Sequence, residues 1–497
     1  MDAFPPSAEP PHGVVPPEPP APPSQTRRVA WNTGVQALAR AVAIGLGLLT
    51  TVVLTRYLGV EGYGDYVTVA VYVTAFAVVV DWGTATVLVR ELATRGPDAH
   101  ALVGRALGLR VLIAVGVSAV AAALLPLLYG GADAERVRIG ALVALPFLAF
   151  GAVATTISAF FQSQLQMGRV AAAELAGQAA ATGLVVGLAA LGRGFYEIIL
   201  AFALSSAVFA AIMVALARRR VSLAPRYDRD AWRSLALASA PLGAALVVNA
   251  VYFRADALLL SLLRGSREVG IYGVAYRFVE VAVPFSHFLV LALFPLLSAA
   301  AANRAWTALH RGLQRGMDVL VVVAVPLVVG TIAVAPALVP LVVGDRYEES
   351  VLPVRIVMPA AGLLFLTWLA SYLLVAVGRQ ADVLRLNVGA LVLNVALNVA
   401  LIPPYGPVGA AAVKTASEAA LLGGTLFLVQ RRTGFVPSPA VPARALPAGA
   451  AMLAVMLVLD VGFVLQLAAG TAVYTAALVA LRVPSRLGLR ELLGPAR

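Results

Sequence analysis

Long apolar segments, separated by short polar ones, run through almost the whole sequence from Arg27 onward. A helix rises about 1.5 Å per residue, so roughly 20 apolar residues cross the ~30 Å hydrocarbon layer of a membrane. Only 12% of the residues are charged and 61% are hydrophobic, whereas soluble domains average about 25% and 45 to 50%. The sequence therefore predicts an all-α polytopic membrane protein.

We predict about 14 transmembrane helices. Because Asp460 and a two-residue connection separate the last two segments, these two could instead form one re-entrant hairpin. The predicted spans are 31–55, 65–89, 106–129, 139–161, 170–191, 196–217, 234–263, 270–299, 317–343, 352–376, 383–403, 408–430, 444–465 and 467–482.

Two weak internal repeats indicate that twelve of these helices form two six-helix lobes. Six is an even number, so the lobes would keep the same orientation and enclose a central cleft, as in alternating-access transporters. Chance glycine spacing is the alternative explanation. The clearer repeat places Gly59, Gly64 and Tyr66 at a constant offset of 206 from Gly265, Gly270 and Tyr272.

The predicted organisation also includes segments outside the lobes. Paired prolines in the first residues are typical of a disordered polyproline-rich tail. In chain order we predict a disordered Pro-rich cytoplasmic tail (1–28), an N-terminal six-helix lobe (29–217), a cytoplasmic linker (218–233), a C-terminal six-helix lobe (234–432), extra helices 13 and 14 (433–482) and a cytoplasmic tail (483–497).

The distribution of arginines predicts the orientation. Cytoplasmic loops of membrane proteins retain Lys and Arg, whereas translocated loops do not. With the N-terminus inside, the cytoplasmic segments hold 25 cations, Arg110 among them, and the opposite side holds 7. We therefore expect a multi-pass protein of the cytoplasmic membrane with both termini in the cytoplasm. The formal net charge of +12 then reflects topology, and we expect no nucleic-acid partner.

Several kinds of chemistry lack the residues that they need. The sequence has no cysteine and its four histidines are scattered, so we expect no metal site and no thiolate chemistry. The stretch from Gly409 to Lys414 has Val413 where the Walker pattern requires its second glycine. We predict a protein without a cofactor that is not an enzyme and is not driven by ATP.

Charged residues inside the predicted spans require an explanation, since each costs at least ~2.5 kcal/mol at mid-bilayer. Arg40 and Asp81 have matching predicted depths and could pair. These charges either neutralise one another as structural pairs or line a cavity that receives an anionic head group. The intramembrane cations are Arg40, Arg254, Arg277, Arg355 and Lys414.

Three spans carry acidic partners for these cations. Arg254 and Asp256 lie at a depth comparable with Arg277 and Glu280, which are spaced i, i+3. Lys414 and Glu418 are spaced i, i+4, so each of these last two pairs shares a helix face. Arg355 lies only about one turn inside its span and can reach the head groups.

A row of amides marks the eleventh span. Asn387, Asn394 and Asn398 fall at i, i+7 and i+11, on one helix face. Amides in hydrocarbon seek polar partners. This face is therefore either a contact between helices or the wall of a hydrated path.

Four short phrases occur in a fixed order along the chain. They are 56–66 (RYLGVEGYGDY), Asp81-Trp82-Gly83 with Arg90-Glu91-Leu92-Ala93, Ala240-Pro241 followed by Arg254-Ala255-Asp256 and Val269 to Tyr276, and 394–411 (NVALNVALIPPYGPVGAA). Together these phrases resemble the polysaccharide flippases of the MATE-like exporter superfamily, which include the O-antigen translocases. Lys414 stands where that family usually has a small or hydroxyl residue, and fourteen spans resemble the peptidoglycan-precursor flippases.

The resemblance implies a flippase that moves a polyprenyl-pyrophosphate-linked oligosaccharide, such as a polysaccharide or lipopolysaccharide O-antigen repeat unit, across the membrane. Guanidinium groups are good phosphate partners. Export could run partly on the membrane potential, with H⁺ or Na⁺ as a candidate coupling ion. Membrane lipid, glycosyltransferases and a glycan polymerase are the expected partners. The candidate substrate-binding residues are Arg40, Arg254, Arg277, Lys414, Asn394 and Asn398, and the candidate ion-coupling residues are Asp81, Asp256, Glu280 and Glu418.

Three alternative functions were considered. A cation-coupled multidrug antiporter of the same superfamily would be expected to have a cavity rich in carboxylates and aromatic rings. A lipid II type flippase would carry a peptidoglycan precursor. A glycan polymerase or ligase would be expected to have a large outer loop, whereas every predicted outer loop here is about ten residues or shorter.

Overall fold

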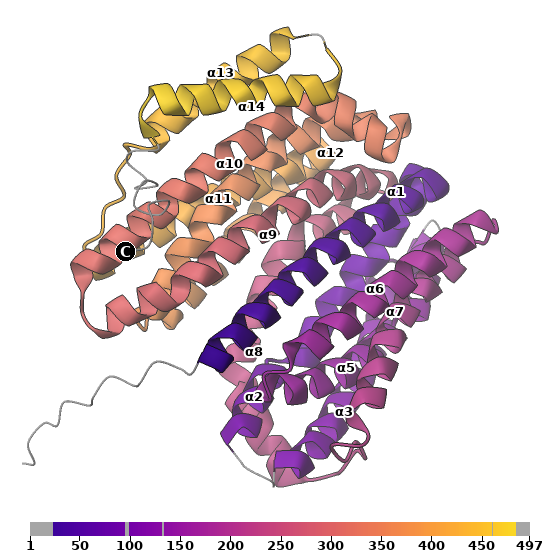
Figure 1. The fold of residues 1–497 in the computed structure, drawn as a ribbon. Coiled ribbons are helices and arrows are strands. Elements are labelled where there is room, and N and C mark those ends of the chain that lie inside the picture. Colours follow the sequence, from indigo (N-terminus) through magenta and orange to yellow (C-terminus); the bar gives the residue numbers. More distant parts are fainter. Residues whose placement is uncertain (1–22, 95–98, 132–133, 460, 484–497) are drawn as a thin grey trace, which may run out of the picture.

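The computed structural model describes residues 23–94, 99–131, 134–459 and 461–483. Every regular element within these ranges is helical, which confirms the predicted all-α class (Figure 1). The elements are α1 (Pro23–Asp81), α2 (Thr84–Thr94), α3 (Ala99–Leu128), α4 (Glu135–Ala144), α5 (Pro146–Ser163), α6 (Met167–Ala190), α7 (Phe195–Ala217), α8 (Arg229–Leu263), α9 (Ser266–Ala302), α10 (Trp306–Val343), the 3₁₀ helix η2 (Asp345–Ser350), α11 (Val351–Ala376), α12 (Gln380–Thr433), α13 (Pro442–Val458) and α14 (Phe463–Ala480).

Two helices are long enough to cross a membrane twice. Among the described residues, ten helical segments are long and apolar enough to span. The segment Leu38–Thr94, which holds most of α1 and all of α2, extends over 57 residues, and α12 extends over 54. Each of the two helices contains one glycine with a positive φ, Gly59 at 69° and Gly406 at 52°, a conformation that glycine adopts without steric cost. With α9 and the shorter α13, these segments agree with about 14 crossings.

Some predicted boundaries differ from the observed ones. The first helix begins at Pro23, inside the tail predicted over 1–28, and residues 1–22 lie outside the described ranges. The predicted span 139–161 is divided between α4 and α5 at Leu145, because Pro146 has no N–H to continue the backbone ladder. The residues predicted to connect spans 11 and 12 belong to α12, where Gly406 alone departs from helical geometry.

The helices gather in two groups, α1 to α7 and α9 to α12, with α13 and α14 beside α10 (Figure 1). Separate apolar cores fill the groups, one around Phe160 and Phe161 and another around Leu313, Leu369 and Leu373. Helix α8 packs against α12 and also against α1 and α2, so it contacts both groups. The lobe boundaries at 217 and 234 stay a prediction.

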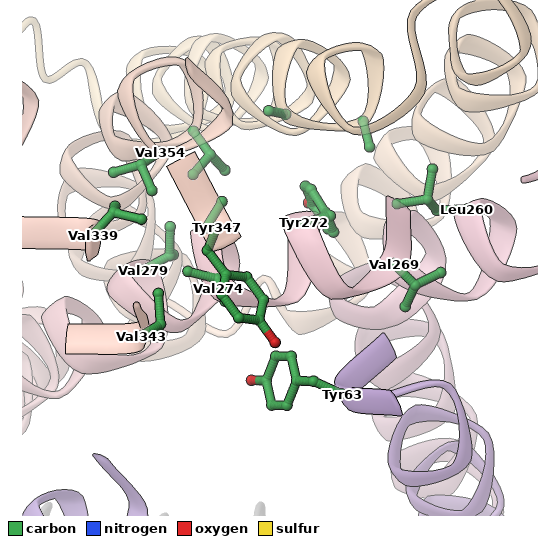
Figure 2. Close-up of a cluster of buried hydrophobic side chains, with 14 of the residues drawn as sticks. Tyr63, Leu260, Val269, Tyr272, Val274, Val279, Val339, Val343, Tyr347 and Val354 are labelled. Atoms are coloured by element: carbon green, nitrogen blue, oxygen red, sulfur yellow. The ribbon is translucent and has the colours of Figure 1, made fainter. Parts of the chain in front are cut away.

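The two groups meet at the end of the bundle that contains Gly59, which we call the closed end. Tyr63 of α1 and Tyr347 of η2 lie edge to face there, 6.2 Å between ring centroids (Figure 2). The Tyr347 hydroxyl donates to the Gly59 carbonyl oxygen at 2.9 Å, and the Ser266 hydroxyl donates to Asp65 at 2.5 Å. Helices α1 and α9 are therefore joined at this end, and we call the opposite end, where α1 begins, the N-terminal end.

Candidate substrate cleft

Two adjoining cavities lie between the helix groups. A narrow cavity of about 390 Å³ lies near the closed end, where Tyr63 lines it. A wide cavity of about 920 Å³ extends toward the N-terminal end, where Arg40 and Met167 line it. Phe147, Gln178 and Ser205 line both. The two cavities therefore form one cleft that ends at the closed end.

The narrow cavity contains the predicted pair Arg277 and Glu280. Arg277 Nη1 lies 2.7 Å from Glu280 Oε2, and the two side chains are 31% and 41% exposed. Gly47 of α1 faces this guanidinium, since a Cβ at Gly47 would lie 2.5 Å from Arg277 Nη2. Arg254 and Asp256 line the same cavity. The structure thus places a partly exposed ion pair and a second arginine within the membrane-spanning part of the cleft.

Asp256 connects the narrow cavity to a buried polar cluster. Its Oδ1 accepts hydrogen bonds from Asn394 Nδ2 at 2.9 Å and from Asn398 Nδ2 at 2.8 Å, and its Oδ2 accepts one from the Tyr272 hydroxyl at 3.3 Å. Asn398 Nδ2 also donates to Asn394 Oδ1 at 2.9 Å. The amide face of α12 therefore makes an interhelical contact with α8, which is one of the two predicted alternatives.

Lys414 and Glu418 form the most deeply buried ion pair. Nζ lies 3.1 Å from Glu418 Oε1, both side chains are fully buried, and the Tyr252 hydroxyl donates to the same oxygen at 2.9 Å. Nζ also lies 4.4 Å and 4.7 Å from the ring centroids of Tyr252 and Phe253. The predicted pair is confirmed. Lys414, Glu418, Asn394 and Asn398 line neither cavity, so their contact with substrate or a coupling ion stays a prediction.

The wide cavity shows a pairing that differs from the prediction. Asp81 and Arg40 both line it, but Asp81 Oδ1 accepts a hydrogen bond from Arg110 Nη2 at 2.7 Å. The predicted pairing of Asp81 with Arg40 is therefore wrong. We counted Arg110 among the loop cations, whereas α3 begins at Ala99, eleven residues earlier, and carries Arg110 into the bundle. Arg110 is only 1% exposed.

Two tyrosines near the cleft were not predicted as site residues, and one predicted intramembrane cation lies outside the cleft. Tyr252 and Tyr272 complete the buried cluster through their hydroxyl groups. The sequence contains a signal for this cluster, because Tyr252 and Asp256 are four residues apart and share a helix face. Arg355 donates Nε to the Ile332 carbonyl oxygen at 3.0 Å and lines neither cavity of the cleft. In the described part of the chain, no three His, Cys, Asp or Glu side chains gather as a metal site.

The fold and the cleft define a polytopic membrane transporter in which two helix groups enclose a cleft that contains charged side chains. The family described as "Polysaccharide biosynthesis protein" matches residues 29–301, more than half of the chain, and the chain belongs to this family. The family described as "MatE" matches residues 241–400. The resemblance to the MATE-like exporters is therefore confirmed.

One curated relative is the "Succinoglycan biosynthesis transport protein ExoT" of Rhizobium meliloti (strain 1021). It is 24% identical over 258 residues, which cover 52% of this chain and 50% of the relative. This chain thus matches about half of the length of that relative. This relative is described as a transport protein, which agrees with the prediction of a transporter.

Solved structures show the same fold at low identity. A structure of "Lipid II flippase MurJ, inward closed conformation" superposes with a TM-score of 0.76 at 13% identity, covering 90% of this chain and 98% of that one. An inward-facing multidrug resistance MATE family transporter gives a TM-score of 0.66 at 15% identity, covering 78% and 93%. These similarities establish the fold, and the cleft residues must supply the argument for a substrate.

Proposed function

We propose that this chain moves a polyprenyl-pyrophosphate-linked oligosaccharide from the cytoplasmic to the outer face of the cytoplasmic membrane by alternating access. The observation that carries the proposal is Arg277, held beside Glu280 in a polar cavity between the helix groups. Stripping sugar hydroxyls of water costs several kcal/mol per group, so a hydrated cleft lowers the barrier to crossing. A guanidinium can then bind the pyrophosphate oxygens through charge-assisted hydrogen bonds.

The orientation follows from the arginine distribution. Under the positive-inside rule the N-terminal end faces the cytoplasm, as do both chain termini. The wide cavity then receives substrate from the cytoplasmic side, while Tyr347 and Ser266 help to seal the outer side. Transport requires the closed end to open and the N-terminal end to close, which is the alternation that we propose.

The energy source that we propose is the membrane potential. Moving a negative charge out of a cell that is negative inside gains about 2.3 kcal/mol per charge per 100 mV. Glu418, Asp81 and Glu280 are each paired with a cation of the protein itself. A coupled H⁺ or Na⁺ would therefore compete with Lys414, Arg110 or Arg277 for these carboxylates, whereas Asp256 is held in its hydrogen bonds by neutral groups.

Replacement of Arg277 tests the proposal in cells. Arg277→Ala should abolish export of the glycan while the amount of protein in the membrane is unchanged, because Glu280 is 41% exposed and stays hydrated. Arg277→Lys should retain partial export, since an ammonium keeps the charge but loses the planar donor geometry. Arg267→Ala is the matched control, because Arg267 pairs with Glu349 outside the cleft. Normal export by Arg277→Ala would contradict the proposal.

A further inference from the structure

Arg110 is a buried cation on the wall of the wide cavity, apart from the Arg277 pair. Its Nη2 donates to Asp81 Oδ1 at 2.7 Å and to Thr155 Oγ1 at 2.8 Å. Asp81 ends α1 and Thr155 lies on α5, so α3 presents this guanidinium between two other helices. All three residues line the wide cavity.

The other two guanidinium nitrogens of Arg110 have no acceptor. Nε and Nη1 are buried and find no hydrogen-bond partner in the part of the chain that the structure describes. Buried donors are normally satisfied, so an unmet one calls for an explanation. In a purely structural ion pair, more of the guanidinium nitrogens would be expected to donate hydrogen bonds. The unmet donors indicate a ligand with acceptor oxygens.

The charges around Arg110 determine which ligand fits. Arg40 and Glu174 also line the wide cavity, and both are exposed. Arg40 and Arg110 carry two positive charges and Glu174 and Asp81 carry two negative ones, so the formal charges of these four side chains balance. Asp81 uses one nitrogen of Arg110, and the charge of Glu174 acts on Arg40. An anion that reached the site would therefore meet the remaining donors of Arg110, and it would compete with Asp81 for Arg110 and with Glu174 for Arg40.

We propose that Arg110 and Arg40 form a second phosphate subsite in the wide cavity. This proposal rests on the proposed function and deepens it: the pyrophosphate of the lipid-linked substrate is held there before it reaches Arg277. The position of the wide cavity supports binding at Arg110 before binding at Arg277. This cavity extends toward the N-terminal end and adjoins the narrow cavity at Phe147, Gln178 and Ser205. The head group would pass from one arginine site to the next.

Equilibrium binding of radiolabelled farnesyl pyrophosphate to the purified full chain tests the subsite, with every variant made in an Arg277→Ala background so that the other arginine site does not contribute. Arg110→Gln combined with Asp81→Asn keeps a neutral hydrogen-bonding pair and should weaken binding about ten-fold. Asp81→Asn alone should bind the probe several-fold more tightly, because Asp81 then no longer competes for Arg110. The control is Arg105→Gln with Asp228→Asn, a pair at 3.0 Å whose arginine lies on the same helix and which lines neither cavity.

The two Asp81 variants separate a binding role from a structural one. If the double variant binds as the Arg277→Ala background does, or Asp81→Asn does not tighten binding, Arg110 is only a structural partner and the subsite is contradicted. The same binding measurement is made with inorganic pyrophosphate. Equal affinity for inorganic and farnesyl pyrophosphate would show that the site binds a free phosphate, and it would contradict the proposal that the site binds a lipid-linked substrate. A protein that binds through Arg110 but moves no lipid-linked sugar would contradict the proposed function instead.

Discussion

Gly64 of α1 and Gly270 of α9 lie against each other at the closed end. A Cβ on Gly64 would lie 2.9 Å from the Gly270 nitrogen and 1.7 Å from the Ser266 carbonyl oxygen, and a Cβ on Gly270 would lie 2.3 Å from the Val60 carbonyl oxygen. Real side chains do not make such contacts, so only glycine allows the two helices to approach this closely. The repeat noticed in the sequence thus marks the two sides of one helix crossing.

Gly64→Ala should loosen the closed end, because the methyl group must push backbone away, at a typical overpacking cost of about 1 to 3 kcal/mol. Since the chain has no cysteine, Thr55→Cys introduces a single buried thiol, on the residue whose backbone carbonyl accepts from the Tyr347 hydroxyl. Maleimide should label this thiol several-fold faster in the Gly64→Ala background. Gly45→Ala is the control, because nothing lies within 4 Å of a Cβ there. Equal labelling rates in all three backgrounds would show that the glycine contact does not hold this end shut.

Gly47→Ala should reduce transport without unfolding the protein. The new Cβ would lie 2.5 Å from Arg277 Nη2, and the guanidinium, at the end of a flexible side chain, can move aside. A misplacement of about 1 Å costs roughly a hundred-fold in well-positioned sites, so the transport rate should fall by about ten- to a hundred-fold. Thermal unfolding checks that the fold is kept, and Gly45→Ala again serves as the matched control. Full activity of Gly47→Ala would mean that the position of Arg277 does not matter.

Lys414→Met should be strongly destabilising. Removing one partner of a fully buried ion pair leaves Glu418 charged and uncompensated, which typically costs about 3 to 5 kcal/mol. The double variant Lys414→Met with Glu418→Gln should recover most of this loss, since Tyr252 can still donate to an amide oxygen. The unfolding midpoints of the single and the double variant in detergent measure the loss and its recovery.

A surface pair provides the comparison for Lys414. Arg267 and Glu349 lie 2.7 Å apart with side chains 46% and 63% exposed, and such pairs contribute only about 0 to 1 kcal/mol. Arg267→Met should therefore barely change the unfolding midpoint. A double Lys414 and Glu418 variant that is as unstable as Lys414→Met alone would show that the stabilisation comes from packing of the lysine and not from its charge.

The sequence predicted the helices well because a membrane span needs a long apolar segment, and such segments are visible without an alignment. The points at which one helix ends and the next begins were harder to predict. The segment Pro403 to Pro407 looked like a loop, yet only Gly406 leaves helical geometry. Local pairs such as Arg277 with Glu280 could also be predicted, since i, i+3 spacing places both side chains on one face.

The contacts between distant helices could not be predicted in this way. Asp256 meets Asn394 and Asn398 across 138 and 142 residues of chain, and their relative rotation depends on packing that no single span reveals. The position of Arg110 is another such case, because an apolar segment that begins at residue 106 predicts this arginine at the membrane surface. Only the longer α3 shows that it is buried.

Transbilayer movement of a fluorescent polyprenyl-pyrophosphate oligosaccharide in proteoliposomes tests the central claim most directly. The assay compares an imposed potential with none, and a lipid II arm and a cationic dye arm examine the alternative substrates. We expect movement of the oligosaccharide lipid that requires the protein, is faster when the potential drives negative charge toward the outer face, and is lost in Arg277→Ala. Extrusion of the dye without movement of either lipid would contradict the account and assign the chain to the drug antiporters.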